Sequence, residues 1–301
     1  MPEEKTIVHS VADLLSEVKK TSACLIVVSG RTSVGKMFKL DRPEMTIGRS
    51  GDADIMLDDE GVSRRHAKIV VRADGSVQLV DLNSTNGTFN NGDKIDVSAL
   101  HDGDKIQIGS ATILKFSYQD SIEEAMTKNL YESATRDGLT HIYNKKYFTD
   151  TLKKEFAYCL RHRVPLSLMI MDIDHFKRIN DTYGHQAGDY VLGRLSGKIN
   201  DAIRAEDLFA RYGGEEFVVL LREAPEDKSF ILAERLRRLV ETTDFTHNGQ
   251  QIKVTISIGI ATLTDGEYAD AESFVASADK HLYKAKQAGR NRVEARMLGG
   301  G

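Results

Sequence analysis

The chain has 301 residues, of which 41% are hydrophobic and 29% are charged, and its formal net charge is −4 at pH 7. This length suits two domains, and the apolar fraction is sufficient for real cores. The near balance of acidic and basic side chains excludes a broad cationic field for nucleic acid, and no polybasic run indicates a membrane surface. We therefore expect neither nucleic acid nor membrane as a partner.

The two cysteines, Cys24 and Cys159, each lie in an apolar stretch. Two distant thiols make a disulfide scaffold improbable, and no Cys/His spacing fits zinc, so we predict that both are buried and inert. The longest apolar run, Ala23–Val28, is far shorter than the roughly 20 residues that a membrane span needs. The N-terminus lacks the basic start and apolar core of a signal peptide. A cytoplasmic protein is expected.

Residues 1–21 form a polar tail, with a short amphipathic helix expected after Ser10. From 22 to 118, short strand-like runs alternate with Asp-Gly and Asn-Gly turn pairs, without helical periodicity. The clearest runs are Cys24–Val28, Met45–Ile47, Ala67–Val71, Val77–Asp81 and Ile113–Phe116. This pattern predicts a small all-β sandwich.

The segment Gly30–Met37 nearly matches the nucleotide-binding loop G-x-x-x-x-G-K-[ST]. Met37 stands where the loop requires a hydroxyl for magnesium, and a strand-like stretch follows instead of a helix. We therefore predict a hairpin turn at this segment.

A helical period begins near Ser121, and residues 119–136 are predicted to be a helical linker with one apolar stripe. Beyond it, Pro165–Asp174 is a mostly apolar run typical of a buried central strand, and Ile252–Ile260 alternates strictly. Helices are expected at about 144–162, 185–203, 227–242 and 271–288. The pattern predicts an α+β domain at 137–297, with a central antiparallel sheet covered by helices.

Four pieces of the β-rich half carry side chains suited to an anion: Gly48-Arg49, Ser63-Arg64-Arg65-His66, Ser84-Thr85 and Asn86-Gly87. A phosphothreonine needs a guanidinium, a hydroxyl and amide donors that converge from rigid loops. Arg49 would supply the bidentate charge and Ser63 a hydroxyl hydrogen bond. Turn chemistry alone would explain the Asn-Gly pair, which is a preferred hairpin turn.

The order Gly-Arg, Ser-x-x-His, Asn-Gly resembles the FHA (forkhead-associated) family of phosphothreonine-binding domains over most of residues 22–118. The resemblance implies a phosphopeptide-binding set and a structural role for His66. The implied set is Arg49, Ser63, Arg64, Arg65, Thr85 and Asn86. The peptide is open, but the tail contains Thr6 and Thr21, so recognition of a phosphorylated Thr6 in the same chain is one hypothesis.

The segment Arg211–Phe217 predicts a β-hairpin whose Gly-Gly tip permits positive φ angles. Taken alone, its adjacent Glu215 and Glu216 are typical of a solvated turn. Asp172 changes this interpretation, because it closes the buried strand and would face Glu215 from a neighbouring strand. Carboxylates so placed repel each other unless a cation joins them, and oxygen ligands suit Mg²⁺, with Mn²⁺ as the alternative.

Residues 137–297 resemble the GGDEF domain of diguanylate cyclases. The matching segments are Asp137–Thr140, Asp172–Asp189, Gly213–Phe217 and Lys286–Asn291. This chain carries glutamate where the family motif has aspartate, a version that active members also use. The resemblance implies condensation of two GTP molecules into cyclic di-GMP. Because each domain holds one GTP, the active species would be a homodimer.

By position in the family motif, Asp172, Glu215 and Glu216 would be catalytic, and Mg²⁺ would be bound by Asp172, the Ile173 carbonyl and Glu215. The implied GTP contacts are Phe176, Lys177, Asn180, Asp189, Gly213, Gly214, Lys286 and Arg290. Asp189 suits guanine, which presents N1–H and N2–H donors that adenine lacks. For Lys286 and Arg290, a solvated helix end is the alternative.

The spacing Arg204-x-x-Asp207 matches the inhibitory product site of the family, to which Arg235 would add a distal contact. The alternative is a surface salt bridge worth under about 1 kcal/mol. The resulting prediction is a phosphopeptide sensor joined to a cyclase, in which docking changes how two cyclase domains meet. A non-catalytic receptor of GTP or cyclic di-GMP and a phosphopeptide-binding scaffold are the alternative functions.

Overall fold

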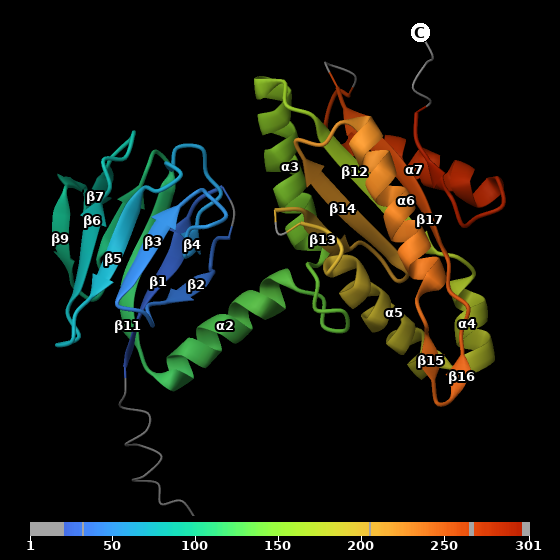
Figure 1. Cartoon of the computed structure of the whole chain (residues 1–301), viewed down its shortest axis with the longest axis horizontal. Coiled ribbons are helices and arrows are strands. Elements are labelled where there is room, and N and C mark those ends of the chain that lie inside the picture. The colour runs from blue at the N-terminus through green and yellow to red at the C-terminus, as the bar shows by residue number, and fades with distance from the viewer. Residues whose placement is uncertain (1–20, 32, 205, 265–267, 297–301) are drawn as a thin grey trace, which may run out of the picture. The chain divides into compact units, whose positions relative to one another are not determined.

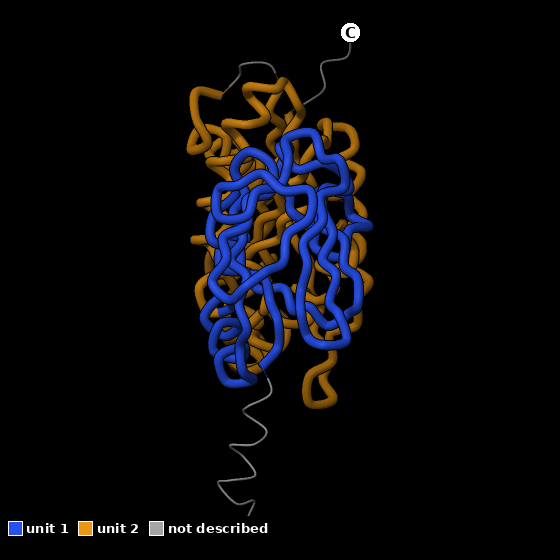
Figure 2. Tube along the Cα trace, turned by 90° about the vertical axis from the view of Figure 1, so that its left-hand side faces the viewer, with its two compact units in different colours: residues 1–132 blue, residues 133–301 orange. Residues whose placement is uncertain are grey.

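The computed structural model describes residues 21–31, 33–204, 206–264 and 268–296. Ser10, Thr6 and the predicted helix of the tail lie outside these residues. The chain divides into two compact units, residues 1–132 and 133–301, which are coloured separately in Figure 2.

Unit 1 contains two β-sheets (Figure 1), as the turn-punctuated strand pattern predicted. The first has the order β2-β1-β11-β10-β7-β8, and the second has the order β4-β3-β5-β6-β9. Their bounds are β1 Ser22–Ser29, β2 Met37–Lys39, β3 Glu44–Gly48, β4 Ile55–Met56, β5 Ala67–Val71, β6 Val77–Asp81, β7 Thr88–Asn90, β8 Asp93–Ile95, β9 Val97–Leu100, β10 Lys105–Ile108 and β11 Thr112–Gln119. Both sheets contribute fully buried side chains to one core, among them Leu25, Ile47, Leu79 and Phe116.

The lookalike of a nucleotide-binding loop is the connection between β1 and β2, which pair as antiparallel neighbours. The Lys36 carbonyl accepts from the Val27 amide at 2.9 Å, and the Gly35 amide donates to the Val27 carbonyl at 2.8 Å. No helix follows, because residues 37–39 form β2. The predicted hairpin is therefore confirmed.

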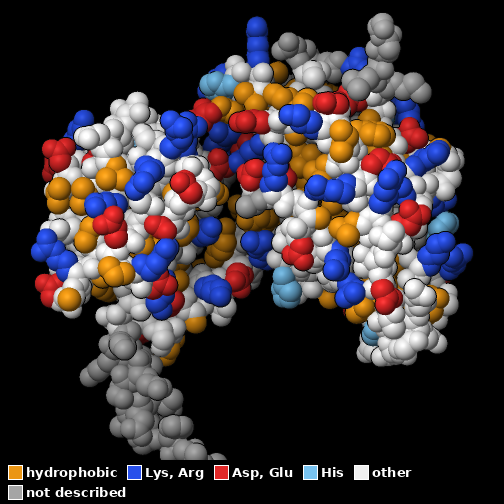
Figure 3. All heavy atoms as spheres, viewed as in Figure 1, with side chains coloured by type: hydrophobic (Ala, Val, Ile, Leu, Met, Phe, Trp, Pro, Cys, Tyr) orange, Lys and Arg blue, Asp and Glu red, His pale blue; other side chains and the backbone are white. Residues whose placement is uncertain are grey.

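The helix α2, Ser121–Thr135, follows unit 1's last strand, as the helical period predicted. Three residues of its apolar stripe, Ile122, Met126 and Leu130, are exposed. No helix among the described residues is both long enough and apolar enough to cross a membrane. In Figure 3, basic and acidic side chains are interspersed over the visible face, in keeping with the nearly balanced composition.

Unit 2 is built on a five-stranded sheet of order β13-β14-β12-β17-β18. Its strands are β12 Leu166–Ile173, β13 Leu208–Arg211, β14 Glu216–Arg222, β17 Ile256–Leu263 and β18 Val293–Glu294, and a separate hairpin pairs β15 Thr246–His247 with β16 Gln250–Gln251. Its helices are α3 Lys145–His162, α4 Phe176–Tyr183, α5 His185–Asn200, α6 Glu226–Thr242 and α7 Ala271–Gln287. The α+β class is confirmed (Figure 1).

The structure refines the predicted sheet in two details. The sheet is mixed, because β18 pairs with β17 in parallel while the other neighbours are antiparallel. In addition, β17 begins at Ile256, although the alternation in the sequence starts at Ile252. Ile252 and Val254 are nevertheless buried in the same core as Ile256 and Ile258, so the alternation reports burial on one face beyond the paired strand.

Both faces of β12 are covered, which explains its unbroken apolar run. Met169, Met171 and Ile173 belong to one core, and Leu168 and Ile170 belong to the other, together with side chains from α3 and α7. Successive side chains of a strand point to opposite faces. The even-numbered Asp172 therefore lies on the face that α7 covers.

Gly259 on β17 sets how closely α7 approaches the sheet. A Cβ at this position would lie 2.1 Å from the Leu282 amide nitrogen and 2.2 Å from the Ala278 carbonyl oxygen, both on α7. Backbone atoms cannot yield as a flexible side chain can, so the glycine permits this contact. The same packing brings the last turn of α7 to the end of β12.

Candidate active site and phosphopeptide site

The two acidic strand ends meet on neighbouring strands. β12 and β14 are antiparallel with Asp172 opposite Glu216, and the Ile173 amide donates to the Glu215 carbonyl at 3.3 Å. Asp172 is buried, with 7% of its surface exposed. The sheet register thus brings these carboxyl-bearing residues together where β12 ends and β14 begins.

Lys286, in the last turn of α7, contributes the nearest cation. Its Nζ lies 2.8 Å from Oδ2 of Asp172. Burial raises the pKa of Asp172, and the hydrogen bond and charge of Lys286 act against that shift. Burial also raises the pKa of Glu215, and the negative charge of Asp172 raises it further. Ionisation of these two carboxyl groups therefore costs free energy, and a nearby cation lowers that cost.

The donor set fits a magnesium ion that also binds substrate. Within the described part of the chain, no three His, Cys, Asp or Glu side chains are grouped as a metal site. Two carboxylates, from Asp172 and Glu215, and the Ile173 carbonyl leave further positions for water and phosphate oxygens, as Mg²⁺ sites commonly do. If Asp172 bound the ion, its ion pair with Lys286 would be broken. The Lys286 ammonium group could then bind a phosphate oxygen.

The hairpin tip is held by Arg211, to which the sequence motif gave no role. Its Nε donates to the carbonyls of Gly213 and Gly214 at 3.2 and 3.1 Å, and its Nη2 donates to the Gly214 carbonyl at 2.7 Å. Its Nη1 also binds Oδ1 of Asp137 at 3.1 Å, which ties the domain entry to the hairpin. The Gly-Gly tip would permit positive φ angles, but neither Gly213 nor Gly214 adopts one.

Four of the predicted GTP contacts lie on two consecutive helices. Phe176, Lys177 and Asn180 are on α4, and Asp189 is on α5. Phe176 is buried, whereas Lys177 and Asp189 are exposed. The helices pack closely at Gly188, where a Cβ would lie 2.0 Å from Oδ1 of Asn180.

Arg290 lies in the turn after α7, and its side chain is exposed. Its amide donates to the Ala285 carbonyl at 3.0 Å, which closes the turn on the last helical residues. Lys286 and Arg290 thus come from one continuous segment at the end of β12, and Lys286 is the one placed beside Asp172.

The predicted inhibitory residues Arg204, Asp207 and Arg235 all line one cavity of about 280 Å³, together with apolar side chains such as Leu232. The Arg204 amide donates to Oδ2 of Asp207 at 3.0 Å, and Arg235 donates to the Ala202 carbonyl at 2.6 Å. Burial raises the pKa of Asp207, and the Arg204 amide opposes this. The structure therefore brings the three together, and the salt bridge that Arg204 makes here is with Glu206, at 3.9 Å.

In unit 1, the predicted phosphate-binding loops are joined mainly through backbone groups. The Arg49 amide donates to the Ser63 carbonyl at 3.1 Å, and the Ser50 amide donates to the Arg64 carbonyl at 3.3 Å. A Cβ at Gly48 would lie 2.0 Å from the Arg64 carbonyl oxygen, so a glycine is needed for this approach. Arg49, Arg64 and Arg65 are exposed at this junction.

His66 joins the serine loop to the Asn-Gly turn from inside the unit. It is fully buried, its Nδ1 accepts from the Ser63 amide at 3.0 Å, and its Nε2 lies 3.1 Å from the Gly87 carbonyl. The first contact assigns the proton to Nε2, which then donates. Burial lowers the pKa of His66, in agreement with a neutral ring in the predicted structural role.

The other members of the set gather around Ser63. Its Oγ accepts from the Thr85 amide at 3.1 Å and lies 3.3 Å from Oγ1 of Thr85. Asn86 donates from Nδ2 to the Gly61 carbonyl at 2.8 Å, which fixes its side chain across the loops. Arginine, hydroxyl and amide groups are thus brought together at one end of unit 1.

Comparison with known families decides the identity of both units. Residues 134–292 match the family described as "Diguanylate cyclase, GGDEF domain", and residues 45–109 match the FHA domain. The chain belongs to the GGDEF diguanylate cyclase family. Its GGDEF domain follows an FHA domain, in the order that the sequence motifs predicted.

Curated relatives match the GGDEF part. Diguanylate cyclase DosC of Escherichia coli K12 is 40% identical over 175 residues, which are 56% of this chain and 38% of the relative. Diguanylate cyclase A of Treponema denticola is 44% identical over 168 residues, which are 54% of this chain and 45% of the relative. The match therefore covers less than half the length of either relative.

Solved GGDEF structures share the fold of unit 2. A structure of the coiled coil and GGDEF domain of DgcB from Caulobacter crescentus, in complex with c-di-GMP, is 32% identical with a TM-score of 0.54 and covers 57% of this chain and 91% of that chain. Diguanylate cyclase SiaD of Pseudomonas aeruginosa, in complex with its activator SiaC, is 32% identical with a TM-score of 0.53 and covers 58% of this chain and 66% of that chain.

Proposed function

We propose that this chain is a diguanylate cyclase that condenses two GTP molecules into cyclic di-GMP and two pyrophosphates, under the control of its FHA domain. The observation that carries the proposal is that Asp172 of β12 lies opposite Glu216 of β14, with Glu215 directly before that strand and Lys286 at 2.8 Å from Asp172. A buried carboxylate, two partly buried ones and a lysine at one strand end suit a metal–triphosphate substrate.

Different elements of unit 2 would bind the metal, the triphosphate and the guanine base. Asp172, Glu215 and the Ile173 carbonyl would hold Mg²⁺, or Mn²⁺ in its place, which neutralises charge on the phosphates. Lys286 and Arg290 bind the triphosphate from the end of α7, and Phe176 and Lys177 contact it from the first turn of α4. Asn180 and Asp189 read the guanine edge, while the Gly213–Gly214 tip, held by Arg211, leaves room for the nucleotide.

The reaction joins the 3′-oxygen of each GTP to the α-phosphorus of the other, as each pyrophosphate leaves. Glu216, opposite Asp172 in the sheet register, is the proposed acceptor of the hydroxyl proton. Each domain presents one GTP, so two copies must face each other with twofold symmetry. The active form is therefore a homodimer, in which most of the rate comes from positioning and charge neutralisation.

Two regulatory functions follow from the other sites. The cavity lined by Arg204, Asp207 and Arg235 is assigned to product inhibition, with guanidinium donors and a carboxylate acceptor for guanine. The FHA domain is assigned to a phosphothreonine peptide through Arg49 and Ser63, with Arg64, Arg65, Thr85 and Asn86 around them. Docking would shift how two cyclase domains meet.

The corresponding division of the chain is a tail at 1–21, a phosphothreonine-binding domain at 22–118, a helical linker at 119–136 and a cyclase domain at 137–297. The helix α2 lies within the proposed linker. A phosphorylated Thr6 in the tail is one candidate ligand of the FHA domain, and a Thr6→Ala variant with unchanged response to phosphorylation would exclude it.

The direct test is incubation of the purified chain with GTP and Mg²⁺, with pyrophosphate release and the mass of the product as readouts. We expect cyclic di-GMP from the wild type and none from Glu215→Gln, which keeps the shape of the side chain but loses its charge. GTP binding without pyrophosphate release, with and without phosphorylation, would instead favour a receptor. Phosphopeptide binding with no nucleotide binding would favour a scaffold.

A further inference from the structure

The turn after α7 has an unusual backbone. Gly289, Arg290 and Asn291 have φ angles of 110°, 63° and 46°. Left-handed φ angles are uncommon for residues other than glycine, and Arg290 and Asn291 adopt them in succession. Such conformations persist where the surrounding structure holds them in place, and they gather at functional sites.

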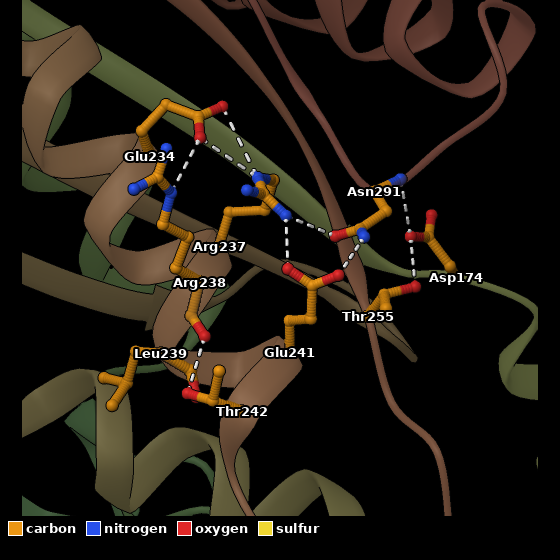
Figure 4. Close-up of polar contacts among 9 residues, drawn as sticks. All are labelled: Asp174, Glu234, Arg237, Arg238, Leu239, Glu241, Thr242, Thr255 and Asn291. Carbon is orange, nitrogen blue, oxygen red and sulfur yellow. Dashed lines mark hydrogen bonds and ion pairs between the residues drawn. The ribbon is translucent and has the colours of Figure 1, made fainter.

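The first anchor of this turn is the buried carboxylate of Asp174, directly after β12. Its Oδ2 accepts from the Asn291 amide at 3.0 Å and from Oγ1 of Thr255 at 2.7 Å, and its Oδ1 accepts from Oγ of Ser257 at 2.6 Å. Asp174 is 5% exposed. Figure 4 shows it beside Thr255 and Asn291. The turn is thus tied to the segment that carries the metal-binding Asp172.

The second anchor comes from α6 and uses the Asn291 side chain. Its Oδ1 accepts from Nη1 of Arg237 at 2.8 Å, and its Nδ2 donates to Oε1 of Glu241 at 2.7 Å. Arg237 and Glu241 also pair with each other at 2.8 Å, which closes a triangle (Figure 4). The Arg237 side chain is 12% exposed, and charge-assisted bonds of this kind are short and directional.

These two anchors fix the residue next to Arg290 on both its backbone and its side chain. Arg290 itself is exposed, and the helix that ends before the turn carries Lys286 at the β12 end. Rotation of the turn would therefore move Arg290 relative to Lys286 and Asp172, which α7 and β12 hold in place. We propose that Asn291, held by Arg237 and Glu241 of α6, is a positioning residue that sets triphosphate binding. The inference rests on the proposed cyclase function.

The most selective variant is Asn291→Gly. Glycine adopts the left-handed conformation without strain, so the turn remains accessible while both side-chain bonds disappear. We expect a melting temperature close to that of the wild type. The turn would be less well fixed, so KM for GTP and the Kd of a non-hydrolysable GTP analogue should both rise about tenfold, and kcat should change less.

Two arginines on α6 provide a matched pair. Arg237→Ala removes the bond to Asn291 and should raise the Kd of the GTP analogue as Asn291→Gly does. Arg238→Ala should leave it unchanged, because that side chain is 75% exposed and its described ion pair is with Glu234 at 3.8 Å. The Asn291→Gly/Arg237→Ala double variant should show little additional loss of GTP-analogue affinity, since both changes remove the same Arg237–Asn291 hydrogen bond.

An unchanged Kd and KM in Asn291→Gly and Arg237→Ala would overturn the inference, as would equal losses in Arg237→Ala and Arg238→Ala. Should Asn291→Gly fail to fold, Arg237→Gln decides the question by the same readouts. Wild-type protein that binds the analogue but releases no pyrophosphate contradicts the cyclase proposal alone, and the Kd comparison still tests the positioning role. A wild type that binds no analogue overturns both.

Discussion

In unit 1, the arginines assigned to phosphate are exposed on loops, whereas in unit 2 two cations near the proposed site, Lys286 and Arg211, are partly buried and bound to carboxylates. The loops around Arg49 are fixed by backbone hydrogen bonds and the buried ring of His66. In unit 2, Lys286 pairs with Asp172 and Arg211 with Asp137. Under the proposed function, unit 1 would present these charges to a phosphopeptide, whereas the cations of unit 2 are paired with carboxylates that a substrate would have to replace.

The difference predicts how each unit responds to mutation. An exposed arginine can be removed at little cost in stability, because its loop is held by other groups. Within a partly buried network, each side chain supports its neighbours, so a substitution alters the geometry of the groups that remain. Unit 1 should therefore lose binding with its fold unchanged, and unit 2 should lose activity in proportion to how directly a residue meets the metal or the triphosphate.

The largest effect is expected for Asp172→Asn. The amide cannot supply the negative charge that the metal requires, so cyclic di-GMP production should fall at least about 1,000-fold. Lys286 is partly exposed and can turn to solvent, so thermal stability should change little. Activity and melting temperature are measured on the same preparation. If Asp172→Asn kept a tenth of the wild-type activity, Asp172 would not be a ligand of the metal.

In unit 1, we expect Arg49→Ala to bind a phosphothreonine peptide about 100-fold more weakly than the wild type does. The Kd rises because the variant loses a bidentate charge-assisted contact. The melting temperature should remain unchanged, because the loop contact of this residue uses its backbone amide. Arg72→Ala is the matched control, since Arg72 is exposed and bonds to Gln78 away from the proposed site. Equal peptide affinity in all three proteins would reject the assigned site.

A smaller effect in unit 2 is expected from Gly188→Ala. The added Cβ would lie 2.0 Å from Oδ1 of Asn180, so the amide assigned to guanine must move. We expect KM for GTP to rise about tenfold. Gly193→Ala on the same helix meets no atom within 4 Å and should leave KM unchanged while slightly stabilising the helix. Identical KM values for the two variants would argue against guanine recognition at Asn180.

The smallest effect is a pH dependence of product inhibition. Burial raises the pKa of Asp207, so this carboxylate gains its proton at a higher pH than an exposed aspartate does. Because the ionised form is the proposed acceptor from guanine, inhibition by cyclic di-GMP should weaken on acidification, and it should do so at a higher pH than an exposed aspartate would give. Asp207→Asn should be weakly inhibited throughout. Inhibition that strengthens on acidification in the wild type would contradict the assigned role.

Local patterns in the sequence were sufficient to predict most of the fold. Turn pairs marked the strands of the sandwich, the apolar run marked β12, and helical periods marked α3, α5, α6 and α7. The short α4 was not predicted, because its eight residues form a polar stretch at the site itself. The two-residue β18 was also missed, since only tertiary pairing with β17 defines it.

The motifs located the site but gave no indication of what holds it in place. Arg211 and Asp137 are 74 positions apart, and Asp174 and Asn291 are 117 apart, so no local pattern links them. The packing roles of Gly48 and Gly188 likewise depend on which carbonyl or amide lies opposite in space. Motif residues can be predicted from one sequence, whereas the contacts that orient them require the folded chain.

The central claim is that the ends of β12 and β14 share a divalent cation. It is tested most directly by a crystal structure with Mn²⁺ and a non-hydrolysable GTP analogue, using the anomalous signal of manganese. We predict a peak bound by Asp172, Glu215 and the Ile173 carbonyl, with Lys286 moved from Asp172 to a phosphate. Nucleotide bound with no peak at these three ligands, and with Lys286 still on Asp172, would contradict the account.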